Sequence, residues 1–222
     1  MNISFDELIT KLKNPLLTIK EWSSFTEGKT INPEIWTQVD KRGWNPLMYL
    51  LAYLTNPDIV KEALRQISTI EKQNPEILTQ VNKDGWNLLM IALRYQKDHN
   101  IIKEILSHIS TIAKQNPEIW TQVTKDGWNL LMIVLRYKDP EIIKAILSQI
   151  DKLEHVTQKE IWAQVTKCGW YPLLLALRNQ TDPNIIGAIL SHVSTLENVQ
   201  KIREQADNYG WDTLSNPLEF YI

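Results

Sequence analysis

The side chains of this chain that could carry out covalent or metal chemistry are few and scattered. There is one cysteine, Cys168, and no histidine stands close to it in the sequence to serve as a base. His108 and His192 occupy equivalent places in a repeated pattern and are predicted to be polar surface residues. No cysteine or histidine spacing matches a zinc site, and the chain has no phosphate-binding loop, dinucleotide fingerprint or hydrolase motif. We therefore expect a non-enzymatic protein with no catalytic residue, no metal and no cofactor.

Tryptophan, arginine and tyrosine, in contrast, recur at regular intervals. A Gly-Trp pair occurs five times, with spacings of 42, 42, 42 and 41 residues. Its tryptophans, called the turn tryptophans below, are Trp44, Trp86, Trp128, Trp170 and Trp211. A second set has the same period and consists of the repeat arginines Arg94, Arg136 and Arg178 and the repeat tyrosines Tyr53, Tyr95 and Tyr137. Because these residue types dominate the binding energy of protein interfaces, both sets are candidate partner-binding residues, with Trp211 at the incomplete end left out.

A structural interpretation remains open for both sets. A tryptophan just after a glycine can pack on its counterpart in the next repeat, and each arginine can pair with a carboxylate or helix end of a neighbour. The arginine and tyrosine sets are broken in the outer copies by Ala52 and Asn179, which indicates that the middle copies matter most for binding. A third recurring set lies in an apolar stripe and is predicted to be buried core: Trp36, Leu78, Trp120 and Trp162.

A repeated unit of 42 residues must position these side chains. Asn32–Gln73 reads NPEIWTQVDKRGWNPLMYLLAYLTNPDIVKEALRQISTIEKQ, and Asn74–Gln115 repeats most of it. We assign an N-terminal helical cap, four repeats, and a partial repeat with a C-terminal cap to residues 1–30, 31–73, 74–115, 116–157, 158–199 and 200–222. Copies of one sequence at such a regular period indicate a tandem array, in which neighbouring units bury one another's apolar faces.

Each unit contains three segments with helical patterns. The first is short and opens with Asn-Pro-Glu, where asparagine can cap and proline suits the first turn. The second follows the Gly-Trp pair. In the second repeat Asn87 is its predicted N-cap, and the following LLMIALRY is apolar on nearly every side, as expected of a helix between neighbours. In the third segment, apolar residues from Ile101 to Ile112 fall along one helical stripe.

Composition favours an all-α protein. Seven glycines are few for an all-β fold, and no segment alternates as a half-buried strand should. In the N-terminal cap, Ser4 and Glu7 form a capping-box pair, and Asn14-Pro15 is predicted to begin a second helix. No apolar run approaches the roughly 20 residues of a membrane span. A net charge of -2 gives no general attraction to nucleic acid or anionic lipid.

The stretch GWNPLMYLLAYLTNPDIVKEAL, residues 43–64, resembles an ankyrin repeat. That family introduces its first helix with Gly-x-Thr-Pro-Leu-His, and here Gly-Trp-Asn-Pro-Leu-Met stands in these places. Asp58-Ile59-Val60-Lys61 matches the start of the family's second helix. The resemblance implies an all-α helical-repeat solenoid, ankyrin-like, with three helical segments in each unit. It also implies that the turn tryptophans, repeat arginines and repeat tyrosines lie on the concave, partner-facing surface.

The chain departs from the family pattern in two ways. The histidine is replaced by Met48, Met90, Met132 and Leu174. A longer third segment followed by NPEIWTQV stands where the family has a Gly-Ala-Asp-x-Asn finger, so the unit has 42 residues where the family has about 33. Armadillo-like or HEAT-like stacking, which uses units of about this length, is therefore the second choice.

These observations lead us to expect a scaffold that binds a partner protein or peptide in a concave groove. We expect it to be monomeric alone. We also expect it to be cytoplasmic, because one cysteine cannot form a disulfide framework and no secretory signal is visible. One alternative is an RNA-binding or single-stranded nucleic-acid-binding helical-repeat protein, which the balanced charge disfavours. Another is the binding arm of a larger, effector-type protein that bacteria deliver into a host cell, which is a family-level analogy.

Overall fold

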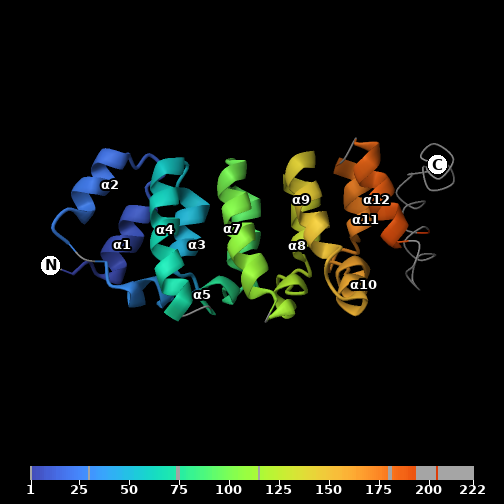
Figure 1. Ribbon diagram of the computed structural model, residues 1–222, viewed down its shortest axis with the longest axis horizontal. Helices are drawn as coiled ribbons and strands as arrows, with labels where there is room; N and C mark the ends of the chain where they lie inside the picture. The colour runs from blue at the N-terminus through green and yellow to red at the C-terminus, as the bar shows by residue number, and fades with distance from the viewer. Residues whose placement is uncertain are drawn as a thin grey trace. The chain divides into compact units, whose positions relative to one another are not determined.

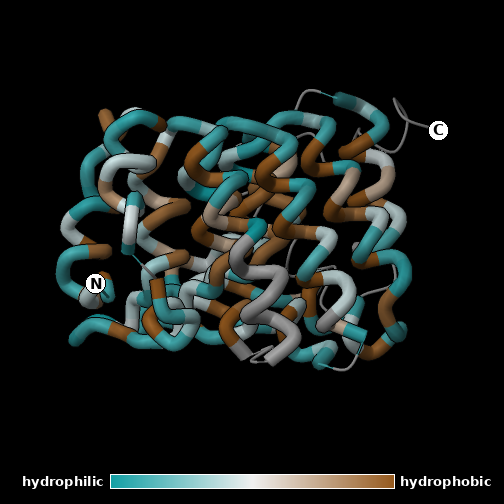
Figure 2. Tube along the Cα trace, turned by 60° about the vertical axis from the view of Figure 1, so that its left-hand side comes forward, coloured by the Kyte–Doolittle hydropathy of each residue, from teal (hydrophilic) through white to brown (hydrophobic). Residues whose placement is uncertain are grey.

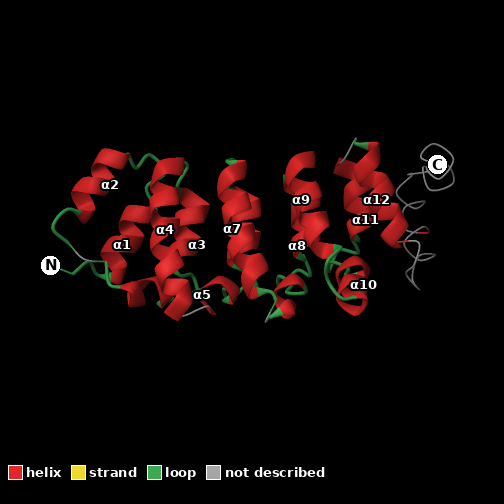
Figure 3. Ribbon diagram, in the orientation of Figure 1, coloured by secondary structure: helices red, strands yellow, loops and turns green. Residues whose placement is uncertain are grey.

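The computed structural model of the chain describes residues 2–29, 31–73, 76–114, 116–179, 182–193 and 204. Within these ranges the chain is helix, turn and loop, apart from isolated bridge residues at Asn2 and at the pair Val123 and Asn129 (Figure 3). It divides into two compact units, unit 1 from residue 1 to 119 and unit 2 from residue 120 to 222. The predicted partial fifth copy, with Trp211, lies outside the described residues except for Glu204.

Unit 1 is built from two layers of helices. Its elements in chain order are α1 (Phe5–Leu12), α2 (Ile19–Thr26), the 3-10 helix η1 (Pro33–Thr37), α3 (Pro46–Tyr53), α4 (Pro57–Gln73), α5 (Glu76–Thr79), α6 (Leu88–Tyr95) and α7 (His99–Ile112). Helix α3 packs between α1 and α6, which together make the first layer (Figure 1). Helix α4 packs between α2 and α7, which make the second layer. The short α5 lies at the junction of α4 and α6.

Unit 2 repeats this arrangement. It follows the 3-10 helix η2 (Pro117–Trp120) and contains α8 (Leu130–Tyr137), α9 (Pro140–Ile150), α10 (His155–Ala163), α11 (Pro172–Asn179) and α12 (Pro183–Val193). Helices α8 and α11 pack together as the first layer, and α9 and α12 as the second. The three predicted helical segments are therefore present in the described repeats of both units, and the fold is an all-α helical repeat.

Three of the first-layer helices, α3, α6 and α8, start at buried asparagines. The side chains of Asn45, Asn87 and Asn129 accept the backbone N–H three residues further on, at 2.9, 2.8 and 2.9 Å. All three residues are 1% exposed or less, so their remaining polar atoms need partners. The Asn129 amide donates to the carbonyl of Ile161 at 2.8 Å, which lies in the following repeat. The predicted N-cap Asn87 is thus confirmed, and at Asn45 and Asn129 the capping residue also joins neighbouring repeats.

The core lies between the layers and between successive repeats. Residues 88–93 of α6 are all buried, as the apolar pattern on every side of this helix predicted. The predicted core set is confirmed: the exposed fractions of Trp36, Leu78, Trp120 and Trp162 are 1%, 2%, 3% and 1%. Figure 2 shows apolar stretches concentrated on the helices, with polar stretches at many of the turns.

The second N-terminal helix begins later than predicted. Asn14 and Pro15 lie in a turn, and α2 starts after Thr18, which forms a capping box with Glu21 like the predicted capping box that begins α1. The prediction was wrong because the Asn14 carboxamide oxygen accepts the N–H two residues on and closes the turn instead. Thr-x-x-Glu was the correct signal in the sequence for this helix start.

A glycine turn precedes α3, α6, α8 and α11, and within each unit the first of these turns fits against the turn of the next repeat. Gly43, Gly85, Gly127 and Gly169 have φ angles of 77°, 80°, 81° and 83°, which favour glycine. In unit 2 the backbone N–H of Lys167 donates to the carbonyl of Asp126 at 2.9 Å, and in unit 1 the equivalent bond joins Lys83 to Arg42 at the same length. A Cβ atom on Gly127 would lie 2.8 Å from the carbonyl oxygen of Val165. The turn therefore requires glycine for its backbone angle and for its contact with the neighbour.

We predict that Gly127→Ala destabilises the protein more than Gly28→Ala. Both glycines have positive φ, 81° and 65°, so both variants carry the left-handed penalty of about 1–2 kcal/mol. Only Gly127 is crowded, because nothing lies within 4 Å of a Cβ placed on Gly28. The clash should add about 1–3 kcal/mol to the loss in free energy of unfolding. Urea denaturation measures this difference, and equal losses for the two variants would show that contact between turns does not constrain the array.

Candidate partner-binding face

The four described turn tryptophans are half-buried, which answers the question that the sequence left open. Trp44, Trp86, Trp128 and Trp170 each sit between the glycine of the turn and the first residues leading into a first-layer helix. They are neither sealed like Trp162 nor fully exposed. Each ring is therefore packed on the protein over part of its surface and accessible to a partner over the rest.

A side chain four residues earlier holds each turn tryptophan in place. In unit 2 the hydroxyl oxygens of Thr124 and Thr166 accept the backbone N–H groups of Trp128 and Trp170, at 3.1 and 3.0 Å. In unit 1 the side chains of Asp40 and Asn82 take the same role, at 2.9 and 3.0 Å. A second hydrogen bond joins the same two residues in the opposite direction, because the backbone N–H of Thr124 donates to the carbonyl of Trp128 at 2.9 Å. The tryptophan backbone is consequently fixed before any partner binds.

In unit 2 an arginine lies over each turn tryptophan. The Arg136 guanidinium carbon is 5.9 Å from the ring centroid of Trp128 and 5.6 Å from that of Tyr137. The Arg178 guanidinium carbon is 5.1 Å from the ring centroid of Trp170. These distances fit cation–π contacts, and both arginines are exposed. We call these residues the aromatic–arginine face of unit 2: Trp128, Arg136, Tyr137, Trp170 and Arg178.

Unit 1 carries an equivalent face with one change that the sequence analysis missed. Arg94 lies 5.6 Å from the ring centroid of Tyr95, and Tyr53 and Tyr95 are 39% and 49% exposed. The first repeat has Ala52 at the arginine position, but Arg42 from the glycine turn lies 5.5 Å from the Trp44 ring centroid. The break at Ala52 therefore does not remove the guanidinium group from the first repeat. The aromatic–arginine face of unit 1 consists of Arg42, Trp44, Tyr53, Trp86, Arg94 and Tyr95.

A polar network supports Arg42 and Trp44 in the first repeat. The buried Tyr49 donates its hydroxyl proton to Asp40 Oδ2 at 2.6 Å and accepts a hydrogen bond from the Arg42 guanidinium at 3.0 Å. Partial burial alone would raise the pKa of Asp40, but hydrogen bonds from Tyr49 and from the backbone N–H groups of Trp44 and Arg42 hold that pKa below its usual value. Later repeats have isoleucine or leucine in place of Tyr49, so this network belongs to the first repeat.

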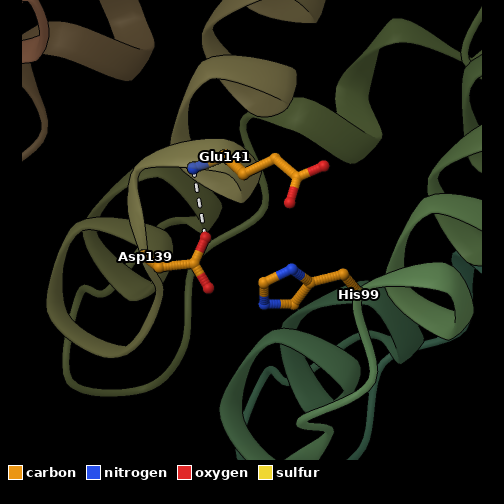
Figure 4. Close-up of side chains that lie close together, drawn as sticks. All are labelled: His99, Asp139 and Glu141. Carbon is orange, nitrogen blue, oxygen red and sulfur yellow. Dashed lines mark hydrogen bonds between the residues drawn. The ribbon is translucent and has the colours of Figure 1, made fainter.

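Other chemistry-bearing side chains do not form a site within either unit. Among the described residues of each unit taken alone, no three His, Cys, Asp or Glu side chains converge as metal ligands. The Asp139 carboxylate caps α9 by accepting the backbone N–H of Glu141 at 3.1 Å (Figure 4). His99, also drawn there, is the first residue of α7 in the other unit. Cys168 is an exposed thiol.

His192, predicted to be a polar surface residue, is half-buried and also packs on the core. Its ring stacks on Trp162 with centroids 4.8 Å apart and an interplanar angle of 12°. Its Nε2 atom lies 3.0 Å from Asp151 Oδ1. The side chain is half-buried, as is its counterpart His108. The sequence showed that the two positions are equivalent but not that the second faces a buried tryptophan.

A recurring set of exposed valines was also missed. The exposed fractions of Val39, Val81, Val123 and Val165 are 45%, 42%, 40% and 39%. Each precedes the residue that holds a turn tryptophan. Their period of 42 residues was the available signal. At the other end of the first-layer helices, Asn179 replaces the repeat tyrosine and donates to the carbonyl of Leu175 at 2.8 Å, so it stabilises its own helix end.

Comparison with known proteins identifies the repeat type. A family model described as ankyrin repeats, in three copies, matches residues 52–159. A search of curated proteins gave no match. Among solved structures the chain is similar to a chain in a predatory endopeptidase from Bdellovibrio bacteriovorus in complex with an immunity protein, with 17% identity and a TM-score of 0.35 over 83% of this chain and 96% of that one. None of the helices in the described ranges combines the length and the apolar character that crossing a membrane requires.

We predict that the arginines over the turn tryptophans contribute little to stability, in contrast to the core tryptophans. Trp162→Ala removes a side chain that is 1% exposed and should cost about 3–5 kcal/mol of unfolding free energy. Arg136→Gln and Arg178→Gln each remove an exposed cation–π contact and should cost at most about 1 kcal/mol. Urea denaturation of the three variants compares them. A loss at either arginine as large as that of Trp162→Ala would mean that the arginine has a structural role.

We also predict an acid-dependent stability that Asp40 contributes to the first repeat. Because its pKa is lowered in the folded protein, the stabilisation is present above the unfolded pKa of about 3.9 and is lost as pH falls through the lower folded pKa. Asp40→Asn should therefore be less stable than the wild type at pH 6, and the difference should shrink as the pH falls below about 4. Denaturation midpoints measured across this range test the prediction, and a gap that is independent of pH would contradict it.

Proposed function

Residues 52–159 make this chain an ankyrin-repeat protein, and on that premise we propose that it is a non-catalytic scaffold that binds a partner protein or peptide through its aromatic–arginine faces. Ankyrin repeats suggest a role in protein–protein interaction and are typically non-catalytic. Beyond this general role, we propose which residues of the chain contact the partner. It assigns the partner-facing role to the turn tryptophans, repeat arginines and repeat tyrosines, with Arg42 in the first repeat.

The observation that supports this proposal is the combination of half-buried rings with exposed guanidinium groups. In unit 2 both repeats present a tryptophan whose backbone is held by a threonine and whose ring lies next to an exposed arginine. Rigid aromatic anchors lose little conformational entropy on binding, and tryptophan, tyrosine and arginine are enriched at binding hot spots. A set placed for internal packing alone would be sealed from solvent, as Trp36, Trp120 and Trp162 are.

A protein partner fits the charge better than a nucleic acid does. The chain carries a net charge of -2, and in two of the glycine turns an acidic residue, Asp84 or Asp126, directly follows the lysine. Phosphate-binding surfaces normally present an uninterrupted basic stripe, and neutralising several phosphates requires it. The arginines here are spaced one per repeat, which suits a few directed contacts.

Capture of partners from the native cell tests the proposal when it is done with matched variants. Trp86→Ala, Trp128→Ala and Tyr95→Ala change the two faces, whereas Val156→Ala changes an apolar residue of α10 that is 67% exposed and lies outside them. Partners bound by the wild type should be retained by Val156→Ala and lost by the face variants, with affinity falling about thirtyfold at a hot spot.

Melting temperature separates a binding defect from loss of the fold. The proposal requires that at least one face variant stays folded and loses the partner. It fails if variants that melt like the wild type keep the same partners, or if binding is lost only in variants that have unfolded.

A further inference from the structure

The two arginines of unit 2 are exposed and lie beside aromatic rings. Arg136 and Arg178 are exposed and lie over Trp128 and Trp170, and neither takes part in the ion pairs formed among the described residues of this unit. Contact with an aromatic ring uses the flat face of a guanidinium group, whereas its five N–H donors lie in the plane at its edge. The donors therefore remain available to a ligand.

The ring contacts also prepare the arginines for binding. A free arginine side chain samples many rotamers, and an approaching ligand must normally restrict them. Contact with Trp128 and Tyr137 limits the positions of the Arg136 guanidinium, and contact with Trp170 limits those of the Arg178 guanidinium. A planar, pre-positioned fork of donors matches a carboxylate, which can accept two parallel hydrogen bonds from it.

The segments that carry the two arginines and their tryptophans contain more cationic than acidic residues, although the chain as a whole does not. The glycine turns at residues 124–129 and 166–171 and helices α8 and α11 contain four cationic residues, Lys125, Arg136, Lys167 and Arg178. The same segments contain one acidic residue, Asp126, which is replaced by Cys168 in the second turn. The net charge of the whole chain is -2, so this excess of positive charge is local.

We propose that the ligand of unit 2 is an acidic peptide segment in extended conformation, whose carboxylates accept hydrogen bonds from Arg136 and Arg178 while its neighbouring side chains contact Trp128 and Trp170. This inference rests on the proposed function and adds the chemistry of the partner. The carboxylates of the peptide balance the excess of cationic residues in these segments, and the half-buried tryptophans supply apolar surface for the peptide's other side chains.

The packing of the helices sets the spacing of the acidic residues. Helices α8 and α11 are direct neighbours in the first layer, and packed helices lie about 8–10 Å apart. An extended chain advances about 3.3 Å per residue. The two guanidinium groups, which occupy equivalent positions on these helices, are therefore matched by acidic residues about three positions apart in the peptide.

Fluorescence polarisation with synthetic peptides tests this proposal on the full chain. The probe is a labelled 12-residue peptide with glutamate at every third position and leucine, tyrosine and serine between. Two matched peptides replace all the glutamates by glutamine or place them consecutively. The spaced glutamate peptide should bind about tenfold more tightly than the glutamine peptide, more tightly than the consecutive one, and more weakly as salt increases.

Matched variants assign the effect to the two arginines. The double variant Arg136→Gln with Arg178→Gln should lower the affinity for the spaced glutamate peptide about tenfold, since each contributes a charge-assisted hydrogen bond at an exposed site. Lys152→Gln with Lys159→Gln removes the same charge from exposed positions outside the face and should change affinity less than about twofold.

The proposal is overturned if the glutamine peptide binds as well as the glutamate peptide, if no peptide binds, or if the lysine variant loses as much affinity as the arginine variant. A 12-nucleotide single-stranded RNA that binds more tightly than the glutamate peptide, and depends on the same arginines, would also overturn it. If partners captured from cells depend on Trp128 but not on the arginines or on salt, the acidic ligand is wrong and the proposed scaffold function stands.

Discussion

The Gly-Trp turn is the constraint on which the rest of each unit depends. Its glycine adopts a φ angle of about 80° and leaves no space for a Cβ atom at Gly127, because the backbone of the next repeat lies against it. This contact allows a backbone hydrogen bond between turns, from Lys167 to Asp126 in unit 2 and from Lys83 to Arg42 in unit 1. In the first three repeats the turn also leads directly into the buried asparagine that caps the first-layer helix. One local conformation thus sets the register of neighbouring repeats and the start of their helices.

The same turn explains why the protein contains two kinds of tryptophan. Trp36, Trp120 and Trp162 lie in or beside the short segments between repeats and are almost fully buried, so their contribution is to the core. The turn tryptophans have their backbones fixed by hydrogen bonds but remain half-buried, with part of each residue exposed. A residue with a fixed position and an accessible ring loses little entropy when it contacts a partner. Regular spacing therefore serves stability at one position of the repeat and binding, as we propose, at another.

Much of the architecture could be predicted because it follows from local patterns. The Asn87 cap, the helices that follow each Gly-Trp pair and the buried Trp36 set all follow from residue type and period. Exposure of the turn tryptophans could not be predicted, since buried and half-buried tryptophans recur with the same period of 42 residues. Contacts between separate segments could not be read from the pattern either. Arg42 supplies a guanidinium group from a position other than that of the repeat arginines, and His192 of α12 stacks on Trp162 of α10. The start of α2 was misplaced because an Asn-Pro pair can form either a helix start or a turn.

Hydroxyl-radical footprinting of the native protein, read out at individual tryptophans by mass spectrometry, tests the central claim most directly. The account predicts measurable oxidation of Trp128 and Trp170 in the folded state, with Trp36 and Trp162 protected until the protein is unfolded by urea. Oxidation of Trp128 and Trp170 as slow as that of Trp162 would contradict it, because the turn tryptophans would then be part of the core and no aromatic–arginine face would be available to a partner.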